Sequence, residues 1–398
     1  MSAVRWLAIP GLVAAACASG ERAPPVATAQ TFAPDTGTAA ATSTVPAPPA
    51  PPATPAKAAS IELTFAGDVM FGRFHDKQGF RPIRAERHDP FTEVAPLLDS
   101  DLAMVNLETP AMKNPPRKSK YGTRMRFVAP PARVATLVKN HVDMVTLANN
   151  HFWDMHAEGV NETPVVLAEV GLRWIGAARR EDPLFRVETT EVKGWKIGFI
   201  AAAAVCNTHW ESAYPKLPYA VPEDFADQLV PVVTSARADH DLVIVVVHWG
   251  DEYQDAPKGW QVRAAHRMID AGADAVIGHH PHVLQGIERY KDGLIAYSLG
   301  NFLFDNTTTV KKYSGVLRLE YARAPADQAA CLDTATFHPV VVVPPDKKVP
   351  VHRPTVARGK KFTIVAERLQ KVSKAKVMTR TEWTVAGDAV TTAGTCAP

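Results

Sequence analysis

Six apolar runs of strand length between residues 61 and 305 each end in side chains able to bind a metal ion or stabilise charge. Near-continuous apolar runs are typical of strands covered on both faces, and helical patterns between several of them favour an α/β fold. In such folds, ligands bind beyond the carboxyl ends of the strands. The polar groups that follow the runs are Asp68; Asn106 and Glu108; Asn149, Asn150 and His151; His248; His280 and His282; and Asn301. We therefore expect one shared site at one edge of a sheet.

The segment 278–285 places three histidines within four residues at the end of a predicted strand. Pro281 fixes its own φ and pushes the preceding residue toward an extended conformation. Residues two apart in an extended segment share a face, so His280 and His282 are expected to point into one site. Imidazole is the commonest protein ligand for metals, although a polar turn that meets only solvent has the same composition.

The other candidate ligands each have an ordinary structural alternative. Asp68 is either a carboxylate ligand or a turn aspartate, and Glu108 is either a bridge between two ions or an isolated acid. Asn150 offers a side-chain carbonyl to an ion. His248 is either a ligand or a core histidine whose hydrogen bonds are satisfied. A mixed set of His, Asp, Glu and Asn suits Zn, Mn or Fe better than Mg or Ca, and we expect one or two divalent ions.

His151 is better suited to acid chemistry than to ligation, because neighbours in an extended segment face opposite ways and Asn150 already faces the site. Asp154 is expected either to orient His151 or to cap the turn that follows it. Glu252 either lines the cleft or lies on the surface. A divalent ion in such a setting lowers the pKa of bound water toward about 7.

The N-terminus resembles a bacterial export signal that ends in Ala14-Ala15-Ala16-Cys17. A lipoprotein-type signal leaves Cys17 lipidated, so acyl chains would hold the mature chain at a membrane surface; plain secretion is the alternative. Residues 18–59, mostly Ala, Pro and Thr, cannot bury enough apolar surface to fold and are expected to form a disordered tether. The expected location is the cell envelope, lipid-anchored on the periplasmic or cell-surface side. The net charge of +3 disfavours nucleic acid as a partner.

The remaining chain is expected to hold one large domain and a short extension. The expected divisions are a signal peptide over residues 1–17, a tether over 18–59, a globular domain over 60–325 and a small, mostly β extension over 326–398. Short strands are expected at 339–345 and 361–366. In an exported protein, a Cys331–Cys396 disulfide would hold the C-terminal tail and leave Cys206 unpaired and buried.

Six motifs occur in order along the chain. They are Gly67-Asp68, Asn106-x-Glu108, Ala148-Asn149-Asn150-His151, His248-Trp249-Gly250-x-Glu252, Gly278-His279-His280-Pro281-His282-x-x-Gln285 and Ser298-Leu299-Gly300-Asn301-Phe302. Together they resemble the CapA family of bacterial poly-γ-glutamate capsule proteins, which are related to the calcineurin-like metallophosphoesterases. The resemblance covers roughly residues 61–320. It implies a four-layer α-β-β-α sandwich with the site at one sheet edge.

The resemblance also implies roles for individual residues. The implied metal ligands are Asp68, Glu108, Asn150, His248, His280 and His282. His151 resembles the catalytic histidine of the phosphoesterase Gly-Asn-His motif, and Asn106 and Asp154 are grouped with it as catalytic residues. Typical phosphoesterases begin with Asp-x-His, whereas Met70 stands at the histidine position here. A thioether is a poor ligand for a hard ion, so the first metal position is short of one ligand.

We expect a membrane-tethered, metal-dependent hydrolase or transferase acting on an anionic extracellular polymer, most simply poly-γ-glutamate, beside other capsule-synthesis membrane proteins. Arg73 and Asn301 are expected to hold substrate carboxylates, since arginine suits bidentate carboxylate binding, and Glu252 is placed with them. A surface charge is the alternative for Arg73. Two other functions fit the same motifs: a non-catalytic component of capsule export or anchoring that binds the polymer, and a phosphoesterase acting on a nucleotide or a phosphorylated envelope molecule.

Overall fold

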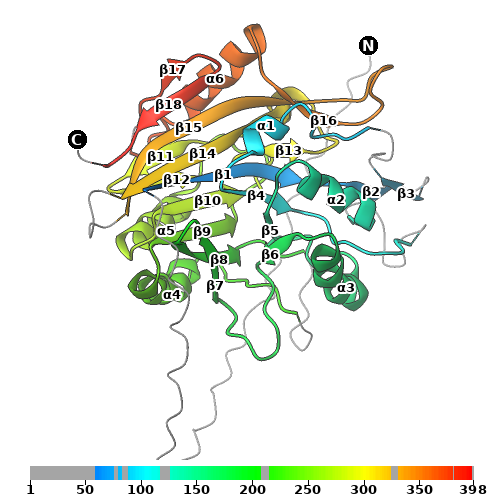
Figure 1. Cartoon of the computed structure of the whole chain (residues 1–398), viewed down its shortest axis with the longest axis horizontal. Helices are drawn as coiled ribbons and strands as arrows, with labels where there is room; N and C mark the ends of the chain where they lie inside the picture. The colour runs from blue at the N-terminus through cyan, green and yellow to red at the C-terminus, as the bar shows by residue number, and fades with distance from the viewer. Residues whose placement is uncertain are drawn as a thin grey trace, which may run out of the picture. The chain divides into compact units, whose positions relative to one another are not determined.

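The computed structural model describes residues 59–75, 79–82, 88–116, 126–207, 215–323, 330–379 and 381–396. The predicted export signal, Cys17 and nearly all of the predicted tether lie outside these residues. The described residues form a mixed α/β fold built on two large β-sheets and one two-stranded sheet (Figure 1). Within them, every helix is too short or too polar to cross a membrane.

The larger sheet contains ten strands and carries the first half of the predicted site. Its strands are β1 (Ser60–Val69), β4 (Leu102–Leu107), β5 (Met144–Thr146), β6 (Arg173–Ile175), β13 (Asn301–Leu303), β14 (Tyr313–Arg323), β15 (Ala330–Val343), β16 (Arg353–Val356), β17 (Thr384–Ala386) and β18 (Ala389–Ala393). The order is β17-β18-β15-β14-β1-β4-β5-β6, with β13 paired to β1 and β16 to β15. The pairs from β1 through β4 and β5 to β6 are parallel, so the carboxyl ends of these strands share one edge.

The second sheet contains six strands and carries the histidine-rich half of the site. Its strands are β7 (Val187–Val192), β8 (Trp195–Ala203), β9 (Leu242–His248), β10 (Ala275–His279), β11 (Ile287–Tyr290) and β12 (Gly293–Ala296). The order is β11-β12-β10-β9-β8-β7, and the pairs that join β8, β9, β10 and β12 are parallel. The small sheet pairs β2 (Gly72–His75) with β3 (Gly79–Pro82).

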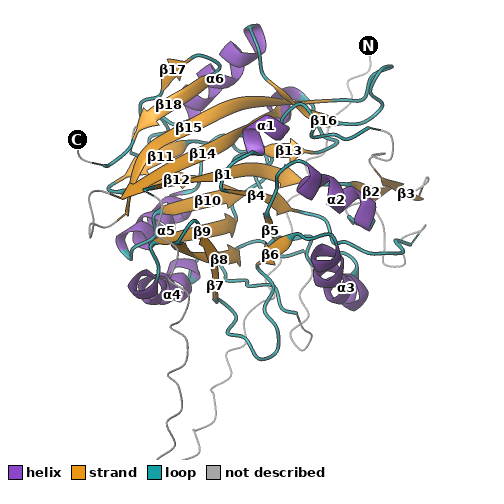
Figure 2. Ribbon diagram, viewed as in Figure 1, coloured by secondary structure: helices purple, strands orange, loops and turns teal. Residues whose placement is uncertain are grey.

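Helices cover the sheets from outside (Figure 2). They are α1 (Ala95–Leu98), α2 (Pro131–Lys139), α3 (His156–Glu169), α4 (Phe225–Asp239), α5 (Gly259–Asp270) and α6 (Lys360–Val372), with a short 3₁₀ turn, η1 (Thr309–Lys312). Alternate residues of β9 face two cores. Leu242, Ile244 and Val246 join the core that contains residues of both large sheets, whereas Val243, Val245 and Val247 join the core formed with α4 and α5. Both faces of β9 are covered, which is why its sequence is an unbroken apolar run.

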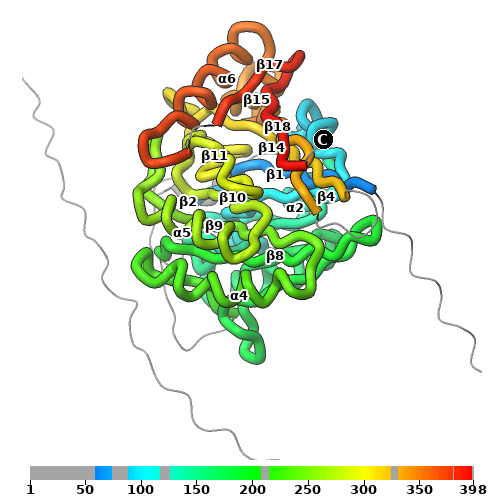
Figure 3. Tube along the Cα trace, turned by 90° about the vertical axis from the view of Figure 1, so that its left-hand side faces the viewer, coloured from blue at the N-terminus to red at the C-terminus, as the bar shows by residue number. Residues whose placement is uncertain are grey.

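The C-terminal residues continue the larger sheet. β15 pairs with β14 from Ala330 to Val341, so it begins earlier than the strand expected at 339–345. The strand expected at 361–366 is wrong, because these residues belong to helix α6. Its buried Val365, Leu369 and Val372 recur at helical spacing and form one apolar face. Figure 3 shows α6 beside β15, far from α4.

The structure contains the expected disulfide between Cys331 and Cys396, whose Cα atoms lie 5.2 Å apart. The bridge ties the segment after β18 to the start of β15, and the backbone nitrogen of Thr395 donates to the carbonyl oxygen of Leu332 at 2.6 Å beside it. Cys206 is half-buried rather than buried as expected.

Candidate metal centre

Polar side chains from both large sheets meet beyond the carboxyl ends of parallel strands. Asp68 is the next-to-last residue of β1, and Glu108 directly follows β4. His248 is the last residue of β9, and His280 directly follows β10. Because β1 pairs in parallel with β4, and β9 with β10, each pair delivers its side chains to one edge. The fold therefore gathers residues that are far apart in the sequence.

Glycines allow the strands that carry these side chains to approach closely. A Cβ atom on Gly67 would lie 1.9 Å from the carbonyl oxygen of Gly300, and one on Gly278 would lie 2.1 Å from the carbonyl oxygen of Tyr297. The first approach lets the backbone nitrogen of Asp68 donate to Gly300 at 2.9 Å. A larger residue would force the backbones apart, so these glycines serve the placement of the site.

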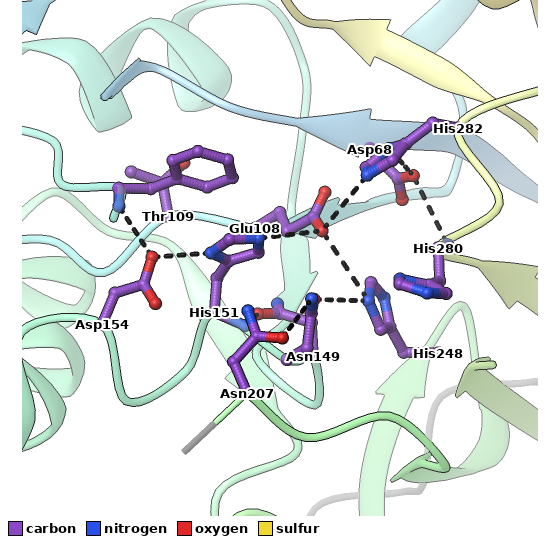
Figure 4. Close-up of polar contacts among 12 residues, drawn as sticks. Asp68, Glu108, Thr109, Asn149, His151, Asp154, Asn207, His248, His280 and His282 are labelled. Carbon is purple, nitrogen blue, oxygen red and sulfur yellow. Dashed lines mark hydrogen bonds and ion pairs between the residues drawn. The ribbon is translucent and has the colours of Figure 1, made fainter. Parts of the chain in front are cut away.

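Glu108 lies at the centre of the cluster and is fully buried. Its Oε1 atom lies 3.7 Å from Nε2 of His248 and 3.9 Å from Nε2 of both His151 and His282 (Figure 4). Among the described residues, neither of its carboxylate oxygens has a hydrogen-bond partner. A buried carboxylate is costly unless it is paired or coordinates a metal, so this position suits a cation.

Two groups of three side chains around Glu108 have the spacing of metal ligands. The groups are Glu108, His248 and His280, and Asp68, Glu108 and His282. In each group, one ligand atom from every residue lies within 4.8 Å of the others, and all are buried. The Nδ1 atom of His280 is also buried without a hydrogen-bond partner in the described part of the chain. Carboxylate and imidazole ligands of this kind fit one or two divalent ions, with Glu108 shared.

Burial and close charges shift the pKa values of the cluster in opposite directions. Burial raises the pKa of Glu108 to about 8 and lowers the pKa of His280 to about 3. Burial works to lower the pKa of His282, but Glu108 and Asp68 outweigh it and raise this pKa to about 9. Burial works to raise the pKa of Asp68, yet the nearby imidazoles of His279 and His282 hold it well below its usual value. Without an ion, Glu108 and His282 thus keep protons near pH 7, and a bound cation would displace these protons.

His151 stands on the other side of Glu108 from the three candidate ligand histidines (Figure 4). Its Nδ1 atom lies 2.6 Å from Oδ2 of Asp154, which also accepts a hydrogen bond from the backbone nitrogen of Phe127 at 2.7 Å. The imidazole stacks on the Phe127 ring, with 3.8 Å between ring centroids. Burial works to lower the pKa of His151, but Asp154 outweighs it and raises this pKa. Asp154 therefore holds the ring of His151 in place and favours its charged form.

Asn106, which was expected to be catalytic, lies among the candidate ligands. It is fully buried, and its Nδ2 atom donates to Oδ1 of Asp68 at 2.8 Å and lies 3.3 Å from Nδ1 of His248. Its Oδ1 atom accepts a hydrogen bond from Asn149 at 3.1 Å. Both ends of the amide are occupied by its neighbours, which suits Asn106 to positioning the candidate ligands Asp68 and His248.

Asn150 lies beside His248 at the edge of the cluster. Its Oδ1 atom is 2.9 Å from Nε2 of His248, and its Nδ2 atom donates to Oδ1 of Asn207 at 3.1 Å. The side-chain oxygen of Asn150, which was expected to bind an ion, therefore lies next to the ring nitrogen of His248, itself a candidate ligand.

The backbone at His280 and His282 differs from the extended conformation expected for it. Both residues have positive φ, 99° and 56°, which is uncommon for residues with a side chain and is often found at functional sites. The two imidazoles reach the cluster through this turn and not through strand alternation.

Asn301 also departs from its expected role. Its Oδ1 atom lies 3.0 Å from Nδ1 of His282, and its Nδ2 atom donates to the carbonyl oxygen of Lys311 at 3.1 Å. Asn301 is fully buried with both ends of its amide bonded, which suits it to orienting His282.

The other expected substrate residues lie near the cluster. The guanidinium of Arg73 pairs with Asp305 and lies over the ring of Phe127, 5.3 Å from its centroid. Glu252 is half-buried and lies close enough to raise the pKa of His282. Met70 is buried in a small apolar cluster with Phe127 and Phe304, as expected of a residue that is not a ligand.

Four residues in the site were not assigned roles from the sequence. Asn149 and His279 lie inside the motifs, where their position beside predicted ligands was an available signal. His279 places Nδ1 3.2 Å from Oδ1 of Asp68. Phe127 and Asn207 do not belong to the polar groups that end the predicted strands, and nothing in the sequence points to them.

The chain is similar to known capsule proteins. It is 31% identical over 262 residues to the capsule biosynthesis protein CapA of Bacillus anthracis, which covers 65% of this chain and 63% of that protein. It is 31% identical over 266 residues to the PGA biosynthesis protein CapA of Bacillus subtilis (strain 168), which covers 65% of this chain and 67% of that protein. The match to the first relative thus spans less than two thirds of its length.

Among solved structures, the sulfate thiohydrolase SoxB of Thermus thermophilus is 14% identical, with a TM-score of 0.37 over 68% of this chain and 56% of that chain. The profile of the bacterial capsule synthesis protein PGA_cap family matches residues 62–306, more than half of the chain. That family is part of the metallophosphoesterase-like superfamily. The chain therefore belongs to the PGA_cap family of bacterial capsule synthesis proteins.

Proposed function

We propose that this protein is a metal-dependent enzyme of poly-γ-glutamate capsule synthesis that hydrolyses or transfers segments of the polymer. Family membership supports the capsule role. The observation that carries the enzymatic part is the buried Glu108 carboxylate, which belongs to both groups of candidate ligands and lies beside the His151–Asp154 pair. Within the described residues, its oxygens have no hydrogen-bond partner. A structural buried carboxylate would have its own hydrogen bonds.

The candidate ligands and His151 have different tasks in this proposal. Asp68, Glu108, His248, His280 and His282 would hold the metal, which supplies Lewis-acid polarisation of a carbonyl or phosphoryl oxygen when bound. His151 keeps its Nδ1 atom on Asp154, so its Nε2 atom is the one directed toward Glu108 and the cluster. From there it can donate a proton to the nitrogen that leaves when an amide bond of the polymer breaks.

The remaining parts of the chain fit an envelope protein in this proposal. Lipidation at Cys17 would anchor it, residues 18–59 would hold the folded part away from the membrane, and other capsule-synthesis membrane proteins would be its partners. The two large sheets with their outer helices would be the four-layer α-β-β-α sandwich, over 60–325, with 326–398 as an extension of the larger sheet.

Incubation of the purified full chain with poly-γ-glutamate and Zn²⁺, Mn²⁺ or Fe²⁺ tests this function. Gel-filtration of the polymer is expected to show shortening with the wild type and none with His151→Ala, while both proteins retain the same metal content. Phosphate release from model esters in place of shortening would support the phosphoesterase. Polymer binding by a metal-free protein without shortening would support the non-catalytic component, and either result would contradict the proposal.

A further inference from the structure

A cation lies over an aromatic ring beside one of the candidate ligands. The Nζ atom of Lys311, in η1, is 3.4 Å from the centroid of the Tyr253 ring, and this centroid is 6.1 Å from that of His282. Tyr253 is 41% exposed, whereas His282 is buried. Tyr253 and Lys311 thus stand where the buried cluster reaches the surface.

Both residues are fixed to the cluster through its own hydrogen bonds. The backbone nitrogen of Tyr253 donates to the carbonyl oxygen of Pro281 at 2.8 Å, next to His282. The carbonyl oxygen of Lys311 accepts from Asn301, which also holds His282. Two segments that flank the cluster are therefore tied to the same histidine.

The backbone of Tyr253 adds a second sign of function. Its φ is 64°, a conformation that is strained for an aromatic residue and that persists only when the surroundings enforce it. An exposed tyrosine in this conformation, stacked against an ammonium group, contributes little to the packing of the core. The hydroxyl of Tyr253 is paired with Glu252, and Lys311 contacts the face of the ring.

Lys311 lacks an acidic partner within the described residues. In the described parts of the chain, no carboxylate forms an ion pair with it, whereas the nearby Arg73 is paired with Asp305. Lys311 is half-buried, so its ammonium has lost part of its water and gains from a carboxylate ligand. Arg73 is already paired with Asp305, so it is less suited to binding a substrate carboxylate than the sequence suggested.

We propose that Lys311, held over the ring of Tyr253, binds a free carboxylate of the polymer at the mouth of the metal centre. Each residue within a γ-linked glutamate polymer carries one free carboxylate. A cation that binds this carboxylate at a fixed place would set which amide bond of the polymer lies over the cluster. This inference rests on the proposed function, because it assumes that the polymer enters this site.

The test measures the Kd for a γ-linked glutamate oligomer, which reports binding whether or not the protein turns the polymer over. Lys311→Met keeps the apolar stem over the ring and removes the charge, and Lys311→Arg keeps the charge. Lys312→Met is the matched control, since the neighbouring Lys312 lies over Tyr313 instead, 5.4 Å from its centroid. Melting temperatures check that each variant is folded.

We expect Lys311→Met to weaken oligomer binding about five- to tenfold at low salt, with the loss shrinking as salt rises. Lys311→Arg should restore most of the affinity, and Lys312→Met should match the wild type. In the polymer-shortening assay, KM should rise while kcat stays within about twofold. If wild type binds and shortens the polymer and Lys311→Met binds the oligomer equally well, this inference is wrong and the proposed function stands. If wild type neither binds nor shortens the polymer, both are wrong.

Discussion

The Nδ1 atom of His151 lies 2.6 Å from Oδ2 of Asp154, and the Nε2 atom on the other side of the same ring faces Glu108 at 3.9 Å. A carboxylate on one ring nitrogen sets which nitrogen carries the proton and fixes the ring plane. The pair therefore prepares His151 to deliver a proton into the cluster without making it a ligand.

Asp154→Asn should lower kcat for polymer shortening by about 100-fold or more, because the asparagine favours a different tautomer and no longer stabilises the charged ring. Metal content should not change, since among the described residues the Asp154 carboxylate bonds to His151 and the backbone of Phe127 and to none of the candidate ligands. Asp388→Asn, at an exposed turn, is the control and should match the wild type. Equal kcat for Asp154→Asn and wild type would remove the proposed role of the pair.

Metal binding should release protons at pH 7. Burial raises the pKa of Glu108 to about 8, and the neighbouring carboxylates outweigh burial to raise the pKa of His282 to about 9. A metal binds only the deprotonated forms of these groups, so apparent affinity should rise as pH increases through 7 to 9 and fall below that range. Calorimetric titration in buffers of different ionisation enthalpy counts the released protons. An affinity that does not change with pH would contradict these protonation states.

Asn301→Ala should weaken metal binding about 10- to 100-fold, because Asn301 orients the imidazole of His282 from behind. Competition with a chromogenic chelator measures the change. Asn306→Ala is the control: its side chain accepts a hydrogen bond from Thr308 at 2.9 Å and lies outside the cluster. Unchanged affinity in the Asn301 variant would return this residue to the substrate-binding role that the sequence suggested.

Gly67→Ala should destabilise the protein by more than about 2 kcal/mol, because its Cβ atom would lie 1.9 Å from the carbonyl oxygen of Gly300. Gly259→Ala is the contrast. Gly259 begins α5, and a Cβ atom there would meet only the end of the Arg263 side chain at 3.3 Å, so alanine should stabilise slightly. Chemical denaturation of both variants gives the comparison. Equal stability of the two would mean that the close approach of β1 and β13 is unimportant.

The strand ends were predictable from the sequence because parallel strands bury both faces and leave their polar residues at one edge. Asp68, Glu108, His248, His280 and His282 could be grouped on that basis. The turn at His280 and His282 could not, because positive φ at histidine comes from tertiary contacts and has no local signal.

Roles that depend on hydrogen-bond direction were also beyond the sequence. Asn106 and Asn301 lie in the expected place, yet both of their side-chain amides form hydrogen bonds with neighbouring side chains or backbone groups. Helix α6 was misread because residues 362–365, Phe-Thr-Ile-Val, form a short run with β-branched side chains that also fits a strand. Packing against β15 decides between the two.

The account depends most on a divalent ion bound at Glu108. Elemental analysis of protein purified without chelator and then dialysed against Zn²⁺, Mn²⁺ or Fe²⁺ measures it, with Glu108→Gln and His280→Ala alongside. Glutamine keeps the shape of Glu108 and removes its buried charge, so this variant should fold. We predict at least one equivalent of metal in the wild type and a large loss in both variants. A wild type that retains no stoichiometric metal, or variants that retain as much as the wild type, would contradict the account.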